Sequence, residues 1–598
     1  MKNNIYLKAR YLASGGILIF IALALSGLPA MRTWAGSSQT VRDADRGSQY
    51  FVNAAAASAA TEKILARINQ DFLNSGEALV YLNLPFYSGL IPTPLDDSNW
   101  TNYIFFNPKT GVTNSVYVDR FQPATNMPLN GVWSGLYGYA STYRIFANAE
   151  SANDRGGISA AQAQLNVLVT SVPIFEYAIF YNGLMEFSDT ATLNVIGRVH
   201  ANSNIYVGSP QNLTFNSLVT TTGTISSPAN SGYAASTWTG TVTYNGAPSP
   251  GYLTGQPALI LPVGTNSTSS TNVQQILYPP PVGESSSSPL GQQRYYNKAG
   301  LTLIISNVTF TATFKSTPND PAPYVLTTNL TYLTNAAWNW ITTTNSFMDW
   351  RENKTVKVTQ IDVGKMTNWM GANGWLSTNT VGVASKFGFN NPFNILYVAD
   401  SRTTNSSTLT AVRLVNGTNL PSTGLTVATP NPLYIQGNYN CLPQYYGTTN
   451  TTLSAPASVV CDALTILSPA WVDSGSATQL NQNSTSDTLN TAIITGNVPS
   501  TGSGSSQFSG GVSNLPRLLE KWNSATLTLN TSLVCLFNST RATGQFVLPG
   551  TYYLPPIVRQ FSFDQNFLWP SGMPPGTPVF TLPATRAFQK IGNANTVP

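Results

Sequence analysis

The stretch LNVIGRV, residues 193–199, decides how the body of this chain is interpreted. Apolar residues alternate along it at Leu193, Val195 and Val199, on either side of Gly197. A period of two is typical of a β-strand with one buried face, and the glycine permits a sharp bend or the close approach of a neighbouring backbone. We therefore expect a strand here, with Val195 in the core.

The same pattern of alternating residues around a glycine recurs elsewhere in the chain. The other copies are 219–225, 236–242, 433–439 and 492–498. Stacked copies would form the rungs of a β-solenoid, which predicts strands at 433–439 and 492–498 with Ile435 and Ile494 buried. The intervals between copies are irregular, so ordinary antiparallel hairpins with glycine bulges are the alternative.

Beyond residue 75 the chain consists mostly of short β-branched and aromatic runs separated by Gly, Pro, Asn and Ser. Examples are NYIFF (102–106), SVYVDRF (115–121), LTLIISNVTFTATF (301–314) and SATLTLNTSLVCLF (524–537). Such spacing is typical of strands. We expect a mainly β protein with a long N-terminal α-helix, in which a β-solenoid-like (parallel β-helix) body carries additional antiparallel β segments.

An uncharged apolar run of 21 residues, Tyr11–Met31, lies near the N-terminus. It is long enough to cross a bilayer as a helix, and the basic residues before it and Arg32 after it fit an N-terminus in the cytoplasm. The residues expected to anchor it in the membrane are Ile17, Leu18, Ile19, Phe20, Ile21, Leu23 and Leu25. This predicts a single-pass inner-membrane anchor with a periplasmic or extracellular body.

A cleaved signal peptide is the alternative to an anchor. Thr33-Trp34-Ala35 before Gly36 fits a small-x-small cleavage site, and cleavage there would give a secreted protein. The apolar run is longer than a usual signal-peptide core, and this length favours the anchor.

An amphipathic helix is expected directly after the apolar run. No Gly or Pro interrupts Ser48 to Leu73, and apolar or small residues recur at steps of three and four. Ile64, Ile68 and Phe72 lie on the resulting face, and we expect this face to pack against the β-rich head.

Shifts in composition divide the chain into six expected segments. These are 1–35, a cytoplasmic start and membrane helix or signal segment; 36–75, the amphipathic helix; 76–182, a β-rich N-terminal head region; 183–263, a β-solenoid-like segment; 264–425, a mixed β region with insertion loops; and 426–598, a second β-solenoid-like segment with a C-terminal tail.

Charge excludes nucleic acid as a partner. Charged residues make up 9% of the chain against a typical ~25%. The net charge of +5 comes almost entirely from residues 1–75, because the remainder carries 21 basic and 20 acidic residues. No basic stripe is present to neutralise phosphates.

Few residues are available for enzymatic chemistry, and we expect no cofactor and no metal. The single histidine, His200, lies on a presumed strand and is interpreted as a structural residue bonded to a neighbouring strand. The cysteines are Cys441, Cys461 and Cys535. A disulfide between the first two and three buried thiols are the two alternatives for them.

The densest charge cluster is DWRENKTVKVTQIDVGK, residues 349–365. Its paired carboxylates would suit general acid/base catalysis of polysaccharide cleavage. The interleaved cations favour a salt-bridged structural segment instead, because they would hold the carboxyl pKa low. Nearby tryptophans, interpreted as core rather than as a sugar-stacking row, are Trp338, Trp340, Trp350, Trp369 and Trp375.

Several stretches resemble one family. They are 171–209 (SVPIFEYAIFYNGLMEF…VIGRVHANSNIYVGS), 349–366, 431–440 (NPLYIQGNYN), 510–544 and 561–578 (FSFDQNFLWPSGMPPGTP). Together they are similar to large bacterial cell-envelope proteins that look like PilX-type pilus-assembly or minor-pilin-like subunits. The resemblance implies export, a membrane helix, and association with type IV pilus or pseudopilus machinery.

One departure from the family pattern concerns processing. Gly16 precedes Ile17, as expected before a pilin cleavage point, but Ile21 stands where pilin-like precursors carry glutamate. The sequence thus leaves two functions open. The first is a non-enzymatic envelope protein of pilus assembly or adhesion, with the membrane and pilus or secretion subunits as partners. The second is a secreted β-solenoid that binds or cleaves surface polysaccharide.

Overall fold

The computed structural model describes residues 38–594 apart from 154–158, 188–191, 209–210, 228–239, 265–268, 316, 318–319, 321–322, 335–337, 373–392, 501–508, 545, 547–552 and 557. Strand accounts for 39% of the structure and helix for 21%, so the protein is mainly β with an N-terminal helix, as the sequence predicts. Its sheets include both parallel and antiparallel pairings.

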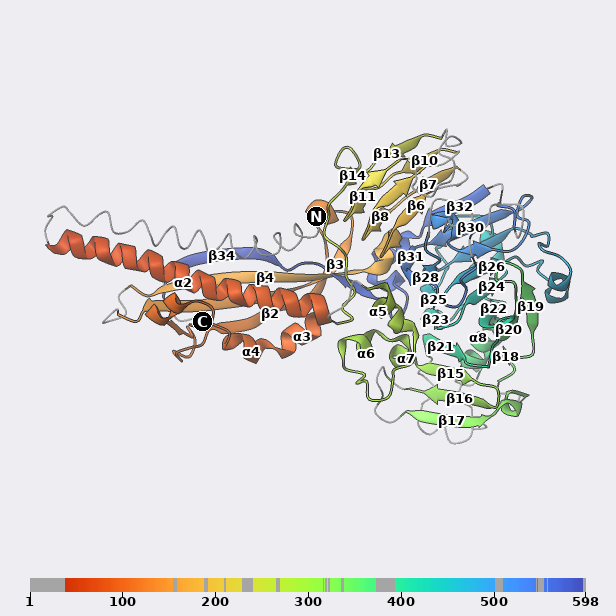
Figure 1. The fold of residues 1–598 in the computed structure, drawn as a ribbon, viewed down its shortest axis with the longest axis horizontal. Helices are drawn as coiled ribbons and strands as arrows, with labels where there is room; N and C mark the ends of the chain where they lie inside the picture. Colours follow the sequence, from red (N-terminus) through yellow and green to blue (C-terminus); the bar gives the residue numbers. More distant parts are fainter. Residues whose placement is uncertain are drawn as a thin grey trace.

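An antiparallel sheet and the long helix α2 form an extended arm (Figure 1). In this sheet β3 pairs with β1, β2 and β4, while β33 and β34 from the far end of the chain pair with β4. The bounds are α2 Ser38–Ser75, β1 Tyr103–Phe106, β2 Tyr117–Pro128, β3 Tyr137–Ser151, β4 Ala161–Pro173, β33 Val579–Thr581 and β34 Thr585–Asn593. Short helices follow α2, namely α3 Glu77–Leu82, α4 Leu84–Ser88 and η2 Ser98–Asn102.

A twelve-stranded sheet runs through the body of the molecule in the order β14-β11-β8-β5-β31-β28-β25-β23-β21-β15-β16-β17. All pairs from β14 to β15 are parallel, and the last two pairs are antiparallel. The bounds are β14 Tyr252–Leu253, β11 Val219–Thr221, β8 Arg198–Ala201, β5 Tyr177–Tyr181, β31 Leu533–Asn538, β28 Ala492–Asn497, β25 Ala457–Cys461, β23 Leu425–Ala428, β21 Ile395–Asp400, β15 Leu301–Ile305, β16 Thr309–Phe314 and β17 Tyr324–Asn329.

Four smaller sheets lie alongside the large one, and their pairs are parallel except for those of β18 and β19 with β20. The first contains β6 Met185–Phe187, β9 Ile205–Val207 and β12 Ile225–Ser226. The second contains β7 Leu193–Val195, β10 Leu213–Phe215 and β13 Val242–Tyr244. The third contains β18 Ile341–Thr342, β19 Ser346–Asp349, β20 Lys354–Asp362, β22 Thr408–Val415, β24 Leu433–Gln436, β26 Leu464–Leu467 and β29 Arg517–Leu518. The fourth contains β27 Asp487–Asn490, β30 Thr526–Thr531 and β32 Val558–Phe563.

Helices connect and cover these sheets. The α-helices are α5 Ser270–Gln274, α6 Pro289–Gln293, α7 Tyr295–Lys298 and α8 Val363–Ala372. The 3-10 helices are η3 Gly131–Trp133, η4 Ile174–Glu176, η6 Gln275–Leu277, η7 Leu330–Thr334, η9 Pro443–Tyr445, η10 Asp473–Ala477, η12 Gly511–Asn514, η13 Gln565–Leu568 and η14 Pro570–Gly572.

The expectation of single strands at 193–199 and 433–439 is wrong. Each stretch contains a corner: β7 ends before Gly197, and β24 ends before Gly437. Both glycines have positive φ, +100° and +80°, so the chain turns sharply where an alternating strand was expected. The stretch 492–498 does form a strand, β28, which ends one residue earlier at Asn497. The residues expected in the core, Val195, Ile435 and Ile494, are buried.

The two halves of the large sheet meet at an unusual junction. From β5 the chain adds strands outward through β8 and β11 to β14. The helices α5, α6 and α7 then lead it to β15, at the other end of the parallel part of the sheet. From β21 it returns strand by strand, until β31 pairs with β5. In chain order, the last parallel strand of the large sheet, β31, therefore pairs with the first, β5.

Candidate functional site

The face of α2 that packs on the arm sheet is the first candidate site. Ile64, Ile68 and Phe72 are 0%, 0% and 1% exposed, and they belong to one apolar cluster with residues of β3 and β4 such as Ile145 and Leu165. The other members of the helix face that are buried in the same way are Ala57, Ala60 and Thr61. These residues, spaced at helical intervals from Ala57 to Phe72, form a continuous apolar contact between α2 and the arm sheet, which we call the seam.

Polar contacts fix the position of α2 at both ends of this seam. Near its start, Asn53 Nδ2 donates to Ser159 O at 2.9 Å. Near its end, Tyr87 Oη donates to Asp71 Oδ2 at 2.7 Å. Between them, Asn69 Oδ1 accepts from the backbone N–H of Ala584 at 2.8 Å, which ties the helix to the C-terminal strands. These buried and half-buried bonds specify one register of helix against sheet.

The membrane-anchor residues Ile17, Leu18, Ile19, Phe20, Ile21, Leu23 and Leu25 lie outside the described residues. Within the described part of the chain, no helix has the length and apolarity needed to cross a bilayer. The structure does show that α2 begins at Ser38, shortly after the apolar run.

His200 is enclosed between strands, as expected of a structural residue. Its Nδ1 lies 2.8 Å from Thr220 Oγ1 on β11 and its Nε2 lies 3.0 Å from Asn202 Oδ1. The ring stacks on Phe180 with 5.7 Å between centroids. Burial lowers the pKa of His200 to about 4, so the ring is neutral near pH 7.

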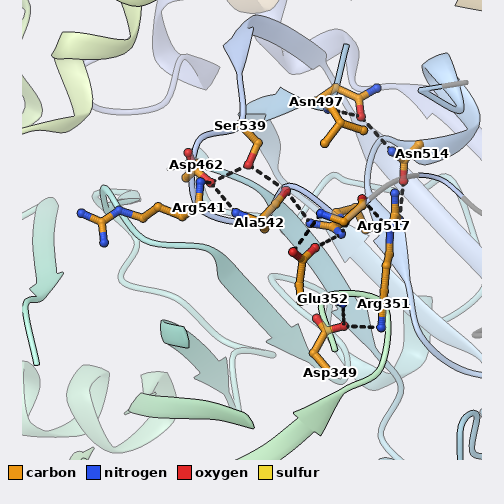
Figure 2. A network of polar contacts seen from close by, with 12 residues as sticks. Asp349, Arg351, Glu352, Asp462, Asn497, Asn514, Arg517, Ser539, Arg541 and Ala542 are labelled. Atoms are coloured by element: carbon orange, nitrogen blue, oxygen red, sulfur yellow. Dashed lines mark hydrogen bonds and ion pairs between the residues drawn. The ribbon is translucent and has the colours of Figure 1, made fainter. Parts of the chain in front are cut away.

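The charged segment 349–365 contributes to a buried polar network, which Figure 2 shows. Arg517 Nη2 donates to Glu352 Oε1, and the N–H of Gly544 donates to Glu352 Oε2 at 2.9 Å. Arg351 Nη1 donates to Asn514 Oδ1 at 2.6 Å. The network thus joins the turn after β19 to β29 and its preceding helix.

Asp349 and Glu352 differ in their pKa. Burial, followed by the charge of Glu352, raises the pKa of Asp349, which accepts from Tyr434 Oη at 2.6 Å. Burial also opposes ionisation of Glu352, but the Arg517 guanidinium outweighs it and lowers the Glu352 pKa. The expectation that cations hold both pKa values low is therefore wrong for Asp349. The two side chains are only 1% and 8% exposed, a geometry that suits cross-linking rather than contact with a substrate.

A third carboxylate in Figure 2, that of Asp462, holds a loop through neutral hydrogen-bond donors. Asp462, 0% exposed, accepts from Ser539 Oγ at 2.6 Å and from the N–H groups of Thr540, Arg541 and Ala542 at 2.8, 3.0 and 3.2 Å. Several donors converging on one carboxylate stabilise its charge in place of water. Asp462 therefore fixes the path of the chain directly after β31.

The tryptophan and cysteine side chains are mainly core. Trp338 and Trp340 are 0% and 1% exposed and pack on each other at 5.8 Å, while Trp375 lies outside the described residues. The three cysteines, Cys441, Cys461 and Cys535, are all buried free thiols, so the disulfide alternative is not observed. In the described part of the chain, no group of three or more His, Cys, Asp or Glu side chains is arranged to hold a metal ion.

Three further buried carboxyl groups were not anticipated from the sequence. Burial raises the pKa of Glu176 and of Asp487 to about 8, and that of Glu520 to about 7. Each accepts hydrogen bonds from nearby backbone N–H groups, which oppose the shift only partly. No local motif marks them, because the shift depends on burial by distant segments.

These carboxyl groups predict a pH dependence of stability. Their folded pKa values exceed the unfolded values near 4, so the stability they contribute is full below pH ~4 and is lost as pH rises through about 7 to 8. We expect the melting temperature, followed by circular dichroism, to fall between pH ~6.5 and ~8. His200 does not interfere there, because its contribution is lost only below its unfolded pKa of about 6.5. Asp487→Asn and Glu520→Gln should each flatten the slope, and a melting temperature that rises over this interval would contradict the assignment.

Trp569 is an exposed aromatic residue that local sequence patterns did not single out. Its side chain is 52% exposed, and its ring packs against Tyr137 of β3 with 5.0 Å between centroids. The stretch 561–578 enters the sequence analysis only through its family resemblance. A tryptophan directly before proline in a polar, Gly- and Pro-rich stretch was the available signal for a surface position.

Comparison with known proteins gives no match: no family model, no curated protein and no solved structure is similar to this chain. The likeness to PilX-type subunits accordingly stays a prediction from the sequence.

Proposed function

We propose that this protein is a non-enzymatic structural protein of the bacterial cell envelope, which takes part in type IV pilus or pseudopilus assembly or in adhesion. Tyr11–Met31 anchors it in the inner membrane, and the body lies on the periplasmic or extracellular side. The observation that carries the proposal is the seam between α2 and the arm sheet. A helix that follows an apolar run and buries its own apolar face on an antiparallel sheet is the arrangement expected of a pilin-like subunit.

The position of α2 in the molecule supports an anchor. Residues 32–37 separate the apolar run from Ser38, so the run and α2 are nearly contiguous. In Figure 1 the start of α2 lies at the end of the arm that is remote from the parallel sheets. A membrane attached there would hold the body away from the bilayer surface.

We also propose that the parallel sheets form a β-solenoid. In the first stack, the strands from β5 to β14, Ile179 lies opposite Val199 and Val199 opposite Val219, each 20 residues later, while the next rung is longer and places Tyr252 opposite Val219. The second stack comprises the strands from β21 to β32. Each turn of the first stack visits the large sheet and then two smaller sheets in the same order, as β5-β6-β7 and β8-β9-β10 do, and β25-β26-β27 and β28-β29-β30 of the second stack do the same. A repeated path with parallel neighbours supports stacked rungs.

Asparagine ladders at the corners support the same proposal. Asn530 Nδ2 donates to Asn490 Oδ1 at 2.7 Å, and Asn490 Nδ2 donates to Asn440 O at 3.2 Å. A second ladder joins Asn245 to Asn216 at 3.0 Å and Asn216 to Asn194. Asn440, Asn490 and Asn530 lie at corresponding positions of successive rungs, where stacked like residues bond to one another's amide and backbone groups.

On this proposal the two stacks have the same hand. Strands from β14 to β15 run in one direction, and both stacks advance the same way along the sheet, from β21 to β31 in the second and from β5 to β14 in the first. Both stacks lie on the same side of that sheet, because β7 contacts β32 and β6 contacts η12. The same sense of rotation with the same advance gives the same hand, so the two stacks continue one another across the β5–β31 junction.

The anchor is tested by the mature N-terminus. We expect the native protein to sediment with membranes, to require detergent for release, and to give an intact mass that begins at Met1 or at Ile17. A protein that begins at Gly36 and is recovered without detergent would overturn the anchor. It would favour instead the second function, a secreted protein that binds polysaccharide. Mass spectrometry of both fractions distinguishes the two.

A further inference from the structure

The segment 563–572, which contains η13 and η14, contributes to the lining of two hollows. The smaller hollow has a volume of about 160 Å³, and Thr452, Ser454, Asp564, Asn566 and Trp569 are among the residues that line it. Hydroxyl, amide and carboxyl groups thus surround one large exposed aromatic ring. This space is below the size usual for drug-like ligands, and it suits a single sugar ring.

The polar groups of the smaller hollow are held in place before any ligand arrives. Asp564 Oδ1 accepts from Thr451 Oγ1 at 2.9 Å and from the N–H of Asn566 at 3.1 Å. Asn566 Nδ2 in turn donates to Thr451 Oγ1 at 3.1 Å. Because these bonds orient the carboxyl and amide groups, little side-chain entropy remains to be lost on binding.

The larger hollow has a volume of about 320 Å³ and lies among the corners of the first stack. Glu176, Arg198, Asn216, Ser217 and Gln565 contribute its polar lining. Arg198 Nη1 donates to Ser134 O at 3.0 Å and its Nη2 donates to Val132 O. Both terminal nitrogens of Arg198, which is only 7% exposed, thus bond to backbone carbonyl groups, so we expect this hollow to recognise a ligand mainly through hydrogen bonds.

Trp569 and Tyr137 connect the two hollows. Trp569 lines the smaller one and its ring packs against Tyr137. The N–H of Tyr137 donates at 2.6 Å to Oε2 of Glu176, which lines the larger one. One polar hollow is therefore lined by a ring of the aromatic pair, and the other is joined to the pair through the bond between Tyr137 and Glu176.

We propose that this surface binds an uncharged chain of pyranose sugars, with one ring stacked on Trp569 and its neighbours hydrogen-bonded in the two hollows. A sugar ring presents an apolar C–H face to an aromatic ring and hydroxyl groups at its rim, which matches an exposed indole surrounded by Asp, Asn, Ser and Thr. The inference rests on the proposed adhesive function, for which it supplies the class of ligand.

The test uses the detergent-solubilised full-length protein and isothermal titration calorimetry. The probes are cellohexaose, maltohexaose and the hexamer of N-acetylglucosamine, which share the pyranose ring and differ in linkage and substituents. We expect at least one probe to bind, and Trp569→Ala to weaken it by about tenfold or more, since loss of a well-packed aromatic contact has an effect of this order. Trp569→Phe should retain part of the affinity, and Asn566→Ala should weaken binding while stacking remains.

Phe86→Ala is the matched control, because Phe86 is 50% exposed but lies on α4 of the arm. It should bind the probe as the unmodified protein does, and circular dichroism should show every variant folded. The absence of binding by all three probes, or equal binding by the folded Trp569→Ala variant, would overturn the inference. Membrane attachment is measured separately, so a soluble protein that still binds sugar would defeat the anchor alone, and a membrane-bound protein that binds none would defeat the sugar site alone.

Discussion

Replacing Ile64, Ile68 and Phe72 together with aspartate is expected to release α2 from the arm sheet. The three side chains are at most 1% exposed, and burial of each contributes ~1.5–3 kcal/mol, to which the cost of an unpaired buried carboxylate is added. The seam therefore should not survive the triple substitution. Limited proteolysis should cleave between α2 and the body within minutes, while the membrane fraction retains the N-terminal fragment.

A control on the same helix separates loss of the seam from added charge. Ala55, Ala66 and Gln70 are exposed on α2, so Ala55→Asp, Ala66→Asp and Gln70→Asp place three charges on its other face. This triple variant should resist protease like the unmodified protein. Equal protection of both triple variants would show that α2 does not depend on the seam. Release of the N-terminal fragment from the membrane fraction would contradict the anchor.

The second large effect is expected at Arg517. Arg517→Met leaves Glu352 as a buried carboxylate without its cation, and removal of one partner of a buried pair costs ~3–5 kcal/mol. Because Arg517 Nη1 also donates to Ala542 O at 3.1 Å, the loop after β31 should loosen as well. Hydrogen–deuterium exchange should accelerate by two orders of magnitude or more in β29 and in residues 539–544.

Two further variants decide how that result is interpreted. In Glu352→Gln combined with Arg517→Met neither charge remains, so the double variant should be less destabilised than the sum of the single ones. Arg586→Met removes an exposed pair with Glu62, whose side chains are 50% and 21% exposed, and it should change stability by no more than ~1 kcal/mol. If Arg517→Met and Arg586→Met have equal effects, the network does not cross-link the body.

Local patterns in the sequence were sufficient for the elements that they encode locally. The spacing of Ile64, Ile68 and Phe72 predicts both a helix and the face that it buries, because helical period and burial coincide. Alternation likewise predicts that Val195, Ile435 and Ile494 are buried. Alternation does not distinguish a strand with a bulge from a corner between two strands. For this reason the sequence predicts strands that continue through Gly197 and Gly437. That choice depends on the backbone conformation that neighbouring rungs impose.

Long-range pairing was not accessible from local patterns. β34 was expected as a tail of the C-terminal segment, and it instead pairs with β4. Nothing in the alternation of either strand selects the other, because many strands of similar composition compete. For the same reason, the partners within the candidate sites could not be predicted from local patterns. The network of Glu352 and Arg517 joins residues 165 positions apart, and only one of the two lies in the charge cluster visible in the sequence.

The pairing of β31 with β5 makes the order of chain delivery important for folding. Ser532 Oγ donates to Tyr177 O, 355 residues earlier in the chain. While the chain emerges from a ribosome or a translocon, one edge of β5 stays unpaired until β31 has emerged and can pair with it. Contacts of such high order form slowly, and an open parallel edge can recruit strands of other chains. Fragments that end before Leu533 are therefore expected to aggregate through that edge, so incomplete synthesis or export of this protein carries a cost beyond the loss of its function.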